Sequence, residues 1–219
     1  MKINAIIFGA TGMVGEGVLH VTLNYPETES VLVVGRRPCT VRHPRLRELI
    51  TTDFTDFSQV RNQLKEYNAC FFCAGTTSVG KTEEEYRRIT YDLTLGAAEA
   101  LVQIHAGITF CYVSGAGTDS TERGRLMWAR VKGKTENDLT KLPFKAVYNF
   151  RPGFIKPIPG LKNAFALARI LGTAYPLWRA LMPNYVCTLE DIGLAMIHAV
   201  ERGYPSTILE NRDIAVLAR

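Results

Sequence analysis

A glycine-rich turn near the N-terminus has the residue types and spacing that hold phosphate groups. It follows the apolar run 3–8 and comprises Gly9, Ala10, Thr11, Gly12, Met13, Val14 and Gly15. In a dinucleotide-binding fold, the first glycine permits a tight turn, the second lets the backbone approach the pyrophosphate, and the third lets the next helix pack closely. The helix N-terminus adds unpaired amides and a positive dipole end. The segment predicts a dinucleotide site; a glycine turn of another α/β protein is the alternative.

Two adjacent arginines bear on the choice of nucleotide. Arg36 and Arg37 come directly after the apolar run 31–34, and no acidic residue is adjacent. NAD-binding proteins place an acid here for the ribose hydroxyls, whereas NADP-binding proteins place arginine against the 2′-phosphate. Guanidinium groups match phosphate in geometry and charge. We therefore expect NADP(H) to be preferred over NAD, with a solvated basic turn as the alternative.

The elements that must position these residues alternate along the chain. Apolar runs typical of buried strands occupy residues 3–8, 31–34, 69–74, 108–113 and 146–150, with a weaker one at 48–52. Helix-like segments lie at 13–23, 56–67, 83–105 and 125–142. Strands and helices alternating at this spacing indicate βαβ units and a parallel sheet. Right-handed crossovers then place helices on both faces. The sequence predicts an α/β fold, a doubly wound parallel sheet.

The alternation of strands and helices does not continue in the C-terminal third of the chain. We expect one domain over residues 1–219, in which 1–153 form the nucleotide-binding sheet and helices. Residues 154–219 are too few for a second core, and we expect a small helical flank or lid on the substrate side. It includes a helix over 189–201 and an apolar stretch, 161–182. Core packing, an apolar substrate pocket, a dimer contact and a membrane-surface contact are all open for that stretch.

Four further motifs follow the later elements in order. They are Cys73-Ala74-Gly75-Thr76-Thr77, Val113-Ser114-Gly115-Ala116, Val131-Lys132-Gly133-Lys134 and Arg151-Pro152-Gly153. With the glycine-rich turn, the chain resembles the short-chain dehydrogenase/reductase superfamily, in particular its small atypical, NAD-dependent epimerase/dehydratase-like members. The resemblance implies a Rossmann-type sheet of order 3-2-1-4-5-6, with the cofactor across its switch point.

The resemblance also assigns residues to the cofactor. It places Asp53 and Phe54 beside the adenine and Lys132 at the ribose. The full expected set is Gly9, Thr11, Gly12, Met13, Val14, Gly15, Arg36, Arg37, Asp53, Phe54, Ala74, Gly75, Thr76, Lys132, Arg151, Pro152 and Gly153.

The catalytic pattern departs from that of the family. Members that transfer hydride carry a serine, a tyrosine and a lysine, the last two as Y-x-x-x-K. Ser114 and Lys132 match, but Trp128 stands where the tyrosine is expected. An indole N–H donates a hydrogen bond yet exchanges no proton at working pH. Asp119, Tyr91 or a bound water is then the substitute acid.

Two functions follow from this departure. In the first, the chain is an NADP(H)-dependent oxidoreductase or epimerase-like enzyme that acts on a small carbonyl or hydroxyl substrate. In the second, it is a catalytically degenerate dinucleotide-binding protein with a regulatory or interaction role. The apolar stretch favours an apolar or aromatic carbonyl substrate over a charged sugar nucleotide.

The composition of the chain limits the classes of molecule that it is expected to bind. Hydrophobic residues make up 47% of the 219 and charged residues 21%, which excludes a disordered or fibrous chain. The net charge of +5 comes with no nucleic-acid-binding motif, so a polyanionic small ligand explains it better. No secretory signal or membrane span is evident, so we expect a cytoplasmic protein, monomeric or homodimeric, with reduced cysteines. The C-x-x-C at Cys70 and Cys73 lies in a strand and the histidines are scattered, so we expect no metal.

Overall fold

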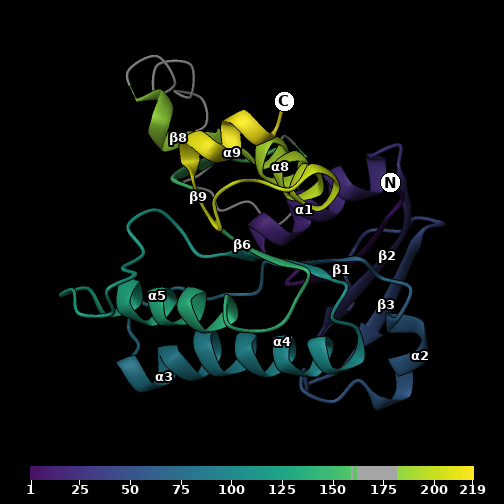
Figure 1. The fold of residues 1–219 in the computed structure, drawn as a ribbon, viewed down its shortest axis with the longest axis horizontal. Coiled ribbons are helices and arrows are strands. Elements are labelled where there is room, and N and C mark those ends of the chain that lie inside the picture. Colours follow the sequence, from purple (N-terminus) through teal and green to yellow (C-terminus); the bar gives the residue numbers. More distant parts are fainter. Residues whose placement is uncertain (159, 162–181) are drawn as a thin grey trace.

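A parallel sheet of seven strands carries the functional motifs (Figure 1). The computed structural model describes residues 1–158, 160–161 and 182–219. The strands are β1 (Ile3–Phe8), β2 (Thr28–Gly35), β3 (Leu46–Ile50), β4 (Ala69–Phe72), β5 (Thr109–Val113), β6 (Ala146–Arg151) and β9 (Ile208–Glu210). Their order is β3-β2-β1-β4-β5-β6-β9, which confirms the Rossmann-type topology and adds a strand at the β6 edge. The order in which strands are added to the sheet reverses between β1 and β4. Ligands of such sheets are expected at the carboxyl ends of these two strands.

Helices cover both faces of the sheet (Figure 1). One face carries α1 (Met13–Asn24), α8 (Leu189–Arg202) and α9 (Asn211–Leu217). The other carries α3 (Glu83–Arg87), the π-helical turn η2 (Arg88–Asp92), α4 (Leu93–Ile104) and α5 (Met127–Leu139). A short 3₁₀ turn, η1 (Ser58–Val60), and α2 (Arg61–Leu64) connect β3 to β4.

Strand alternation divides the core into two apolar clusters. Ile3, Ala5 and Ile7 of β1 belong to the cluster that contains residues of α1 and α8, whereas Ile6 and Phe8 belong to the other. Successive side chains of a strand point to opposite faces, so a strand covered on both sides is apolar at nearly every position. This explains the uninterrupted apolar runs in the sequence.

Glycine lets α8 approach α1 closely. A Cβ added to Gly17 of α1 would lie 2.8 Å from Leu189 Cδ1, and one added to Gly193 of α8 would lie 2.7 Å from Val21 Cβ. At Gly17 and at Gly193, the space that a side chain would occupy is therefore filled by a side chain of the other helix. The C-terminal helix is in this way built into the same core as the glycine-rich turn.

A second, two-stranded sheet lies outside the main one. β7 (Phe154–Lys156) pairs in parallel with β8 (Val186–Thr188), which follows a 3₁₀ turn, η3 (Pro183–Tyr185). Of the apolar stretch 161–182, only Leu161 and Met182 are among the described residues. The interpretation of that stretch therefore lies outside the described part of the chain.

Several element bounds differ from those expected. The helix expected over 56–67 is limited to η1 and α2, because Glu66 and Tyr67 donate to carbonyls three residues earlier and so close 3₁₀-type turns instead of a regular helix. The helix expected over 83–105 contains the π-helical turn η2, and that expected over 125–142 is limited to α5. The weak strand lies at Leu46–Ile50 rather than 48–52. β9 and α9 were not predicted.

Candidate functional site

An open cleft at the carboxyl ends of β4, β5 and β6 gathers most of the motifs. It has a volume of about 390 Å³. Its lining residues are Thr76, Thr77, Ser78, Tyr86, Gly115, Ala116, Trp128, Lys132, Pro152 and Gly153. Three of the four later motifs supply them through the loops that leave the strands, and α5 supplies Trp128 and Lys132. Ligands of doubly wound sheets bind at this edge.

The glycine-rich turn adjoins this cleft through Ala74. Gly9 adopts a φ of +81°, which favours glycine, and a Cβ there would lie 2.5 Å from the Ala74 backbone nitrogen. A Cβ on Gly15 would overlap the Gly9 carbonyl oxygen. Gly12 is the N-cap of α1 and provides no side-chain cap, so the first amides of the helix are available to an anion. The turn is thus a cradle whose backbone is closely packed at Gly9 and Gly15 and open at Gly12, where the nearest atom to an added Cβ lies 3.4 Å away.

Two arginines extend the cradle along the sheet edge. Arg36 and Arg37 follow Gly35, the last residue of β2, which pairs with β1. Both side chains are exposed, and neither has a hydrogen bond or ion pair with another described residue. The amides of the turn and these guanidinium groups together fit a nucleotide that carries several phosphates.

Asp53 and Phe54 follow β3, beside this edge. The Asp53 carboxylate accepts hydrogen bonds from the hydroxyl (2.6 Å) and the amide (2.8 Å) of Thr55, and these bonds lower its pKa. The Phe54 ring is buried edge-to-face against Phe8, with ring centroids 5.6 Å apart. Asp53 is exposed, whereas the Phe54 side chain belongs to the core, so the expected placement of Phe54 beside the adenine is not supported.

Lys132 occupies a desolvated position in the cleft. Its Nζ donates to the carbonyl oxygen of Ser114, at the end of β5. Burial lowers the pKa of Lys132 to about 8, and the nearby Glu136 carboxylate opposes that shift. Trp128 lines the cleft one helical turn earlier, and its indole lies 3.4 Å from a Cβ added to Gly117. Lys132 and Trp128 thus share a helix face that looks onto the cleft.

The Ser114 hydroxyl is not brought into the cleft. The residue is buried, and its Oγ donates to Glu136 Oε1 at 2.5 Å and lies 3.1 Å from the Phe150 carbonyl oxygen. Its neighbours Gly115 and Ala116 line the cleft in its place. As the structure stands, Ser114 offers its carbonyl to Lys132 and no hydroxyl to a substrate.

The Arg151 side chain also lies away from the cleft, although Pro152 and Gly153 line it. The guanidinium binds the Glu136 carboxylate through Nε (3.0 Å) and Nη2 (2.5 Å), and Nη1 donates to Glu210 at 3.1 Å. Its donors are therefore engaged within the protein. The backbone after Arg151, and not the guanidinium, faces the place expected for the cofactor.

Neither side chain expected as a substitute acid lines the cleft. Asp119 accepts hydrogen bonds from Thr121 and Gly124, which organise its own loop and lower its pKa. Tyr91 donates to Asp138 at 2.7 Å.

The titratable side chains among the described residues that line the cleft are Lys132 and Tyr86. Burial raises the pKa of Tyr86, which keeps it protonated. Sequence reasoning missed Tyr86, because a tyrosine on α3 carries no motif.

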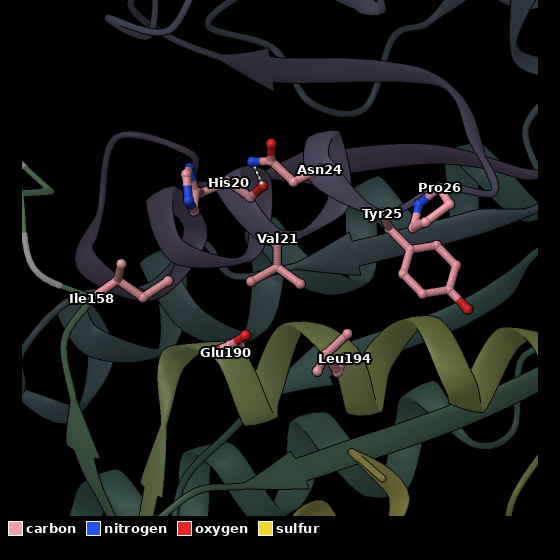
Figure 2. A pocket seen from close by; sticks show the side chains of 8 residues that line it. All are labelled: His20, Val21, Asn24, Tyr25, Pro26, Ile158, Glu190 and Leu194. Carbon is pink, nitrogen blue, oxygen red and sulfur yellow. Dashed lines mark hydrogen bonds between the residues drawn. The ribbon is translucent and has the colours of Figure 1, made fainter.

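A second hollow lies between α1 and α8 (Figure 2). It measures about 310 Å³ and is lined by His20, Val21, Asn24, Tyr25, Pro26, Ile158, Glu190 and Leu194. The Asn24 amide donates to the His20 carbonyl at 2.8 Å, a bond drawn in Figure 2. None of the residues expected to bind cofactor or to act in catalysis lines this hollow.

Two other features bear on the expected partners. In the described part of the chain, no three or more His, Cys, Asp and Glu side chains gather as a metal site would require. No helix within the described ranges combines the length and the apolar character needed to cross a membrane. Cys70 is buried in β4, and burial raises the pKa of its thiol.

A family model and several related proteins match the sequence of this chain. The model of the NAD dependent epimerase/dehydratase family matches residues 5–121, more than half of the chain. Protein FMP52 of Debaryomyces hansenii is 33% identical over 153 residues, which are 68% of this chain and 66% of that protein. The match thus spans slightly less than two thirds of that relative. It is named a mitochondrial protein, as are related proteins of two further yeasts, and this contradicts the cytoplasmic location expected above.

Solved structures share the fold at low identity. MoeE5 in complex with UDP-glucose and NAD is 16% identical, with a TM-score of 0.66 over 98% of this chain and 80% of that one. The Bordetella bronchiseptica enzyme WbmF in complex with NAD+ is 16% identical, with a TM-score of 0.65 over 98% of this chain and 77% of that one. At this identity the likeness shows the fold.

Proposed function

The chain belongs to the NAD dependent epimerase/dehydratase family, and from that premise we propose that it binds NADP(H) and acts as an oxidoreductase or epimerase-like enzyme on a small carbonyl or hydroxyl substrate. One observation carries the proposal. The desolvated Lys132 and the Trp128 side chain line one cleft, whose backbone walls adjoin a phosphate cradle at the switch point of the sheet. In this proposal the cradle holds one end of the dinucleotide and the cleft holds the other.

The preference for NADP(H) rests on charge. Arg36 and Arg37 are exposed at the end of β2 without a partner among the described residues, which leaves both guanidinium groups for a 2′-phosphate. Asp53 lies one strand further, fixed by Thr55, and its carboxylate can accept from the amino group or hydroxyl of an adenosine. The amides at the start of α1 receive the pyrophosphate.

Lys132 has two tasks in this proposal. When bound, the nicotinamide supplies or accepts the hydride. Lys132 holds the ribose through its Nζ, and its pKa of about 8 makes it an acid matched to neutral or mildly alkaline conditions. A proton held at Nζ can therefore pass to the substrate oxygen, directly or through a water. Trp128 excludes water from one side and orients a flat apolar substrate, while its N–H donates a hydrogen bond.

The substrate is expected to be small and largely apolar. The described cleft combines an indole, alanine and proline surfaces with the hydroxyls of Thr76, Thr77 and Ser78. This mixture suits a carbonyl compound with an apolar or aromatic body. The solved relative MoeE5 was determined with UDP-glucose, so a sugar nucleotide is the competing substrate class to include in an assay.

The experiment is NADPH consumption across a panel of aliphatic, aromatic and sugar carbonyls. We expect turnover with at least one apolar carbonyl and a sharp loss in Lys132→Met. Ser114→Ala should cost less than Lys132→Met, because the Ser114 hydroxyl is engaged by Glu136. Saturable NADPH binding with no consumption for any carbonyl would exclude the enzyme assignment.

That outcome would favour the second candidate, a dinucleotide-binding protein without turnover. Two observations support it. Trp128 stands where the family pattern has its acid, and the hydroxyl of Ser114 is turned to Glu136. Such a protein would change its stability or its assembly on binding NADPH, and the oligomeric state with and without nucleotide is the measurement to make. The unliganded protein is expected to be a monomer or homodimer.

A further inference from the structure

A buried carboxylate lies directly behind the proposed site. Glu136 is 1% exposed and sits on α5, one helical turn after Lys132. It accepts the Ser114 hydroxyl at 2.5 Å and two guanidinium donors of Arg151, at 3.0 and 2.5 Å. A buried carboxylate is stable only when it is paired and hydrogen-bonded, and these three bonds meet that requirement.

The same carboxylate reaches Lys132 through Ser114. The Ser114 hydroxyl binds Glu136, and the Ser114 carbonyl accepts the Nζ of Lys132. Ser114 is the first residue after β5, and its amide donates to the Phe150 carbonyl at 2.9 Å. Ser114 is thus held by its hydroxyl, its amide and its carbonyl, and the carbonyl faces Lys132.

Arg151 ties this arrangement to the C-terminal end of the fold. Its Nη2 donates to Ser120 at 2.6 Å and its Nη1 to Glu210 at 3.1 Å. Glu210 ends β9 and caps α9. Arg151 therefore joins α5, β6, β9 and the loop after β5; of these, α5 and the loops after β5 and β6 line the cleft.

We propose that Glu136 is a positioning residue of the site: held by Arg151, its carboxylate fixes Ser114 so that the Ser114 carbonyl keeps the Lys132 ammonium at the cleft. The assignment rests on the proposed function only in giving Lys132 its task. Glu136 itself is buried and is not among the residues that line the cleft.

The charge of Glu136 has a measurable consequence at Lys132. Burial lowers the pKa of Lys132 and the Glu136 carboxylate raises it, so the two effects oppose one another. From α3, Tyr86 also faces the cleft, and burial keeps it neutral. Loss of the carboxylate leaves the Arg151 cation behind, which further disfavours the ammonium form of Lys132. The pKa of Lys132 should therefore fall.

The test is competitive acetylation of Lys132 as a function of pH, read by mass spectrometry on the full chain without nucleotide. Wild-type protein should show a midpoint near pH 8. Glu136→Gln should lower the midpoint by at least about 0.5 pH, which is a threefold change in the proton affinity of the amine. Glu99→Gln, the same change at an exposed site on α4, should leave it in place.

Two further variants cover the case in which Glu136→Gln does not fold. Glu136→Gln with Arg151→Met removes both buried charges, a change that buried pairs often tolerate. Ser114→Ala keeps the ion pair and removes only the link to the loop. Each should lower the Lys132 midpoint by less than Glu136→Gln, because the double variant also removes the Arg151 cation and Ser114→Ala keeps the Glu136 charge.

An unchanged midpoint in folded Glu136→Gln, or in both of these variants, would overturn the proposal. So would a fall in thermal stability without any change at Lys132. Because no nucleotide is present, a protein that fails to bind NADPH would refute the proposed function and leave this result standing.

Discussion

Replacing Gly12 by alanine tests the phosphate cradle at a glycine whose side-chain space is open. The nearest atom to an added Cβ is the Gly9 carbonyl oxygen at 3.4 Å, an ordinary contact, and Gly12 has a φ of −97° that alanine adopts freely. The fold should therefore lose only the preference for glycine over alanine at a helix N-cap, about 0.5–1 kcal/mol. For a chain of this size that lowers Tm by at most about 4 °C.

Binding should suffer more than stability. The methyl group would stand where the pyrophosphate approaches the backbone, and loss of one charge-assisted amide contact is worth about 1.5 kcal/mol or more, a tenfold weaker Kd for NADPH. Gly15→Ala is the matched comparison, because its Cβ would lie 2.5 Å from the Gly9 carbonyl carbon and 2.9 Å from the Ala10 nitrogen. Overpacking of this kind costs about 1–3 kcal/mol, so Gly15→Ala should lose stability and binding together.

The assays are calorimetric titration with NADPH and thermal unfolding of the two variants beside the wild type. We expect Gly12→Ala to separate the two properties and Gly15→Ala to lose both. If folded Gly12→Ala bound NADPH as tightly as wild type, the turn would not hold the pyrophosphate, and the reasoning about its glycines would be refuted.

The remaining predictions concern charge and the proton. Arg36→Ala and Arg37→Ala should each weaken NADPH binding about tenfold and leave NADH binding nearly unchanged. Arg42→Ala is the control, because the Arg42 guanidinium already pairs with a glutamate at 3.2 Å. Equal losses of affinity for both nucleotides would argue against a 2′-phosphate site. Trp128→Tyr should raise carbonyl reduction at least about tenfold, since it restores a phenolic acid at the cleft; NADPH binding without a gain would show that the geometry no longer supports that acid. Between pH 8 and 10.5, Lys132 binds fewer protons in the folded protein than in the unfolded chain. The free energy of unfolding should therefore rise with pH, by up to about 1.4 kcal/mol per pH unit. Urea titrations of Lys132→Met should show a smaller rise.

The sheet order and the cradle could be predicted because their causes are local. Strands covered on both faces are apolar throughout, and the glycine at 15 is required by the Gly9 and Ala10 backbone atoms of the turn itself. The helix expected over 56–67 is too long, because its apolar residues, Phe57, Leu64 and Tyr67, are buried although most of the segment lies outside α2. Burial of these side chains does not require a continuous helix. β9 has three residues, too few for a periodic signal.

Other parts of the site depend on contacts between distant segments. The direction of the Ser114 hydroxyl is set by Glu136, 22 residues later, and that carboxylate is set by Arg151. Tyr86 reaches the cleft because α3 packs beside α5. Neither relation leaves a pattern in the sequence, so the motif residues were identified while the directions of their side chains were not.

A crystal structure of the wild-type protein grown with NADPH would show directly where the nucleotide binds. We expect the pyrophosphate at the amides of Met13 and Val14, the first of α1, the 2′-phosphate against Arg36 or Arg37, and the nicotinamide in the cleft beside Lys132, with room for a substrate next to the Trp128 ring. Nucleotide bound elsewhere, or an indole that fills the nicotinamide position, would contradict it.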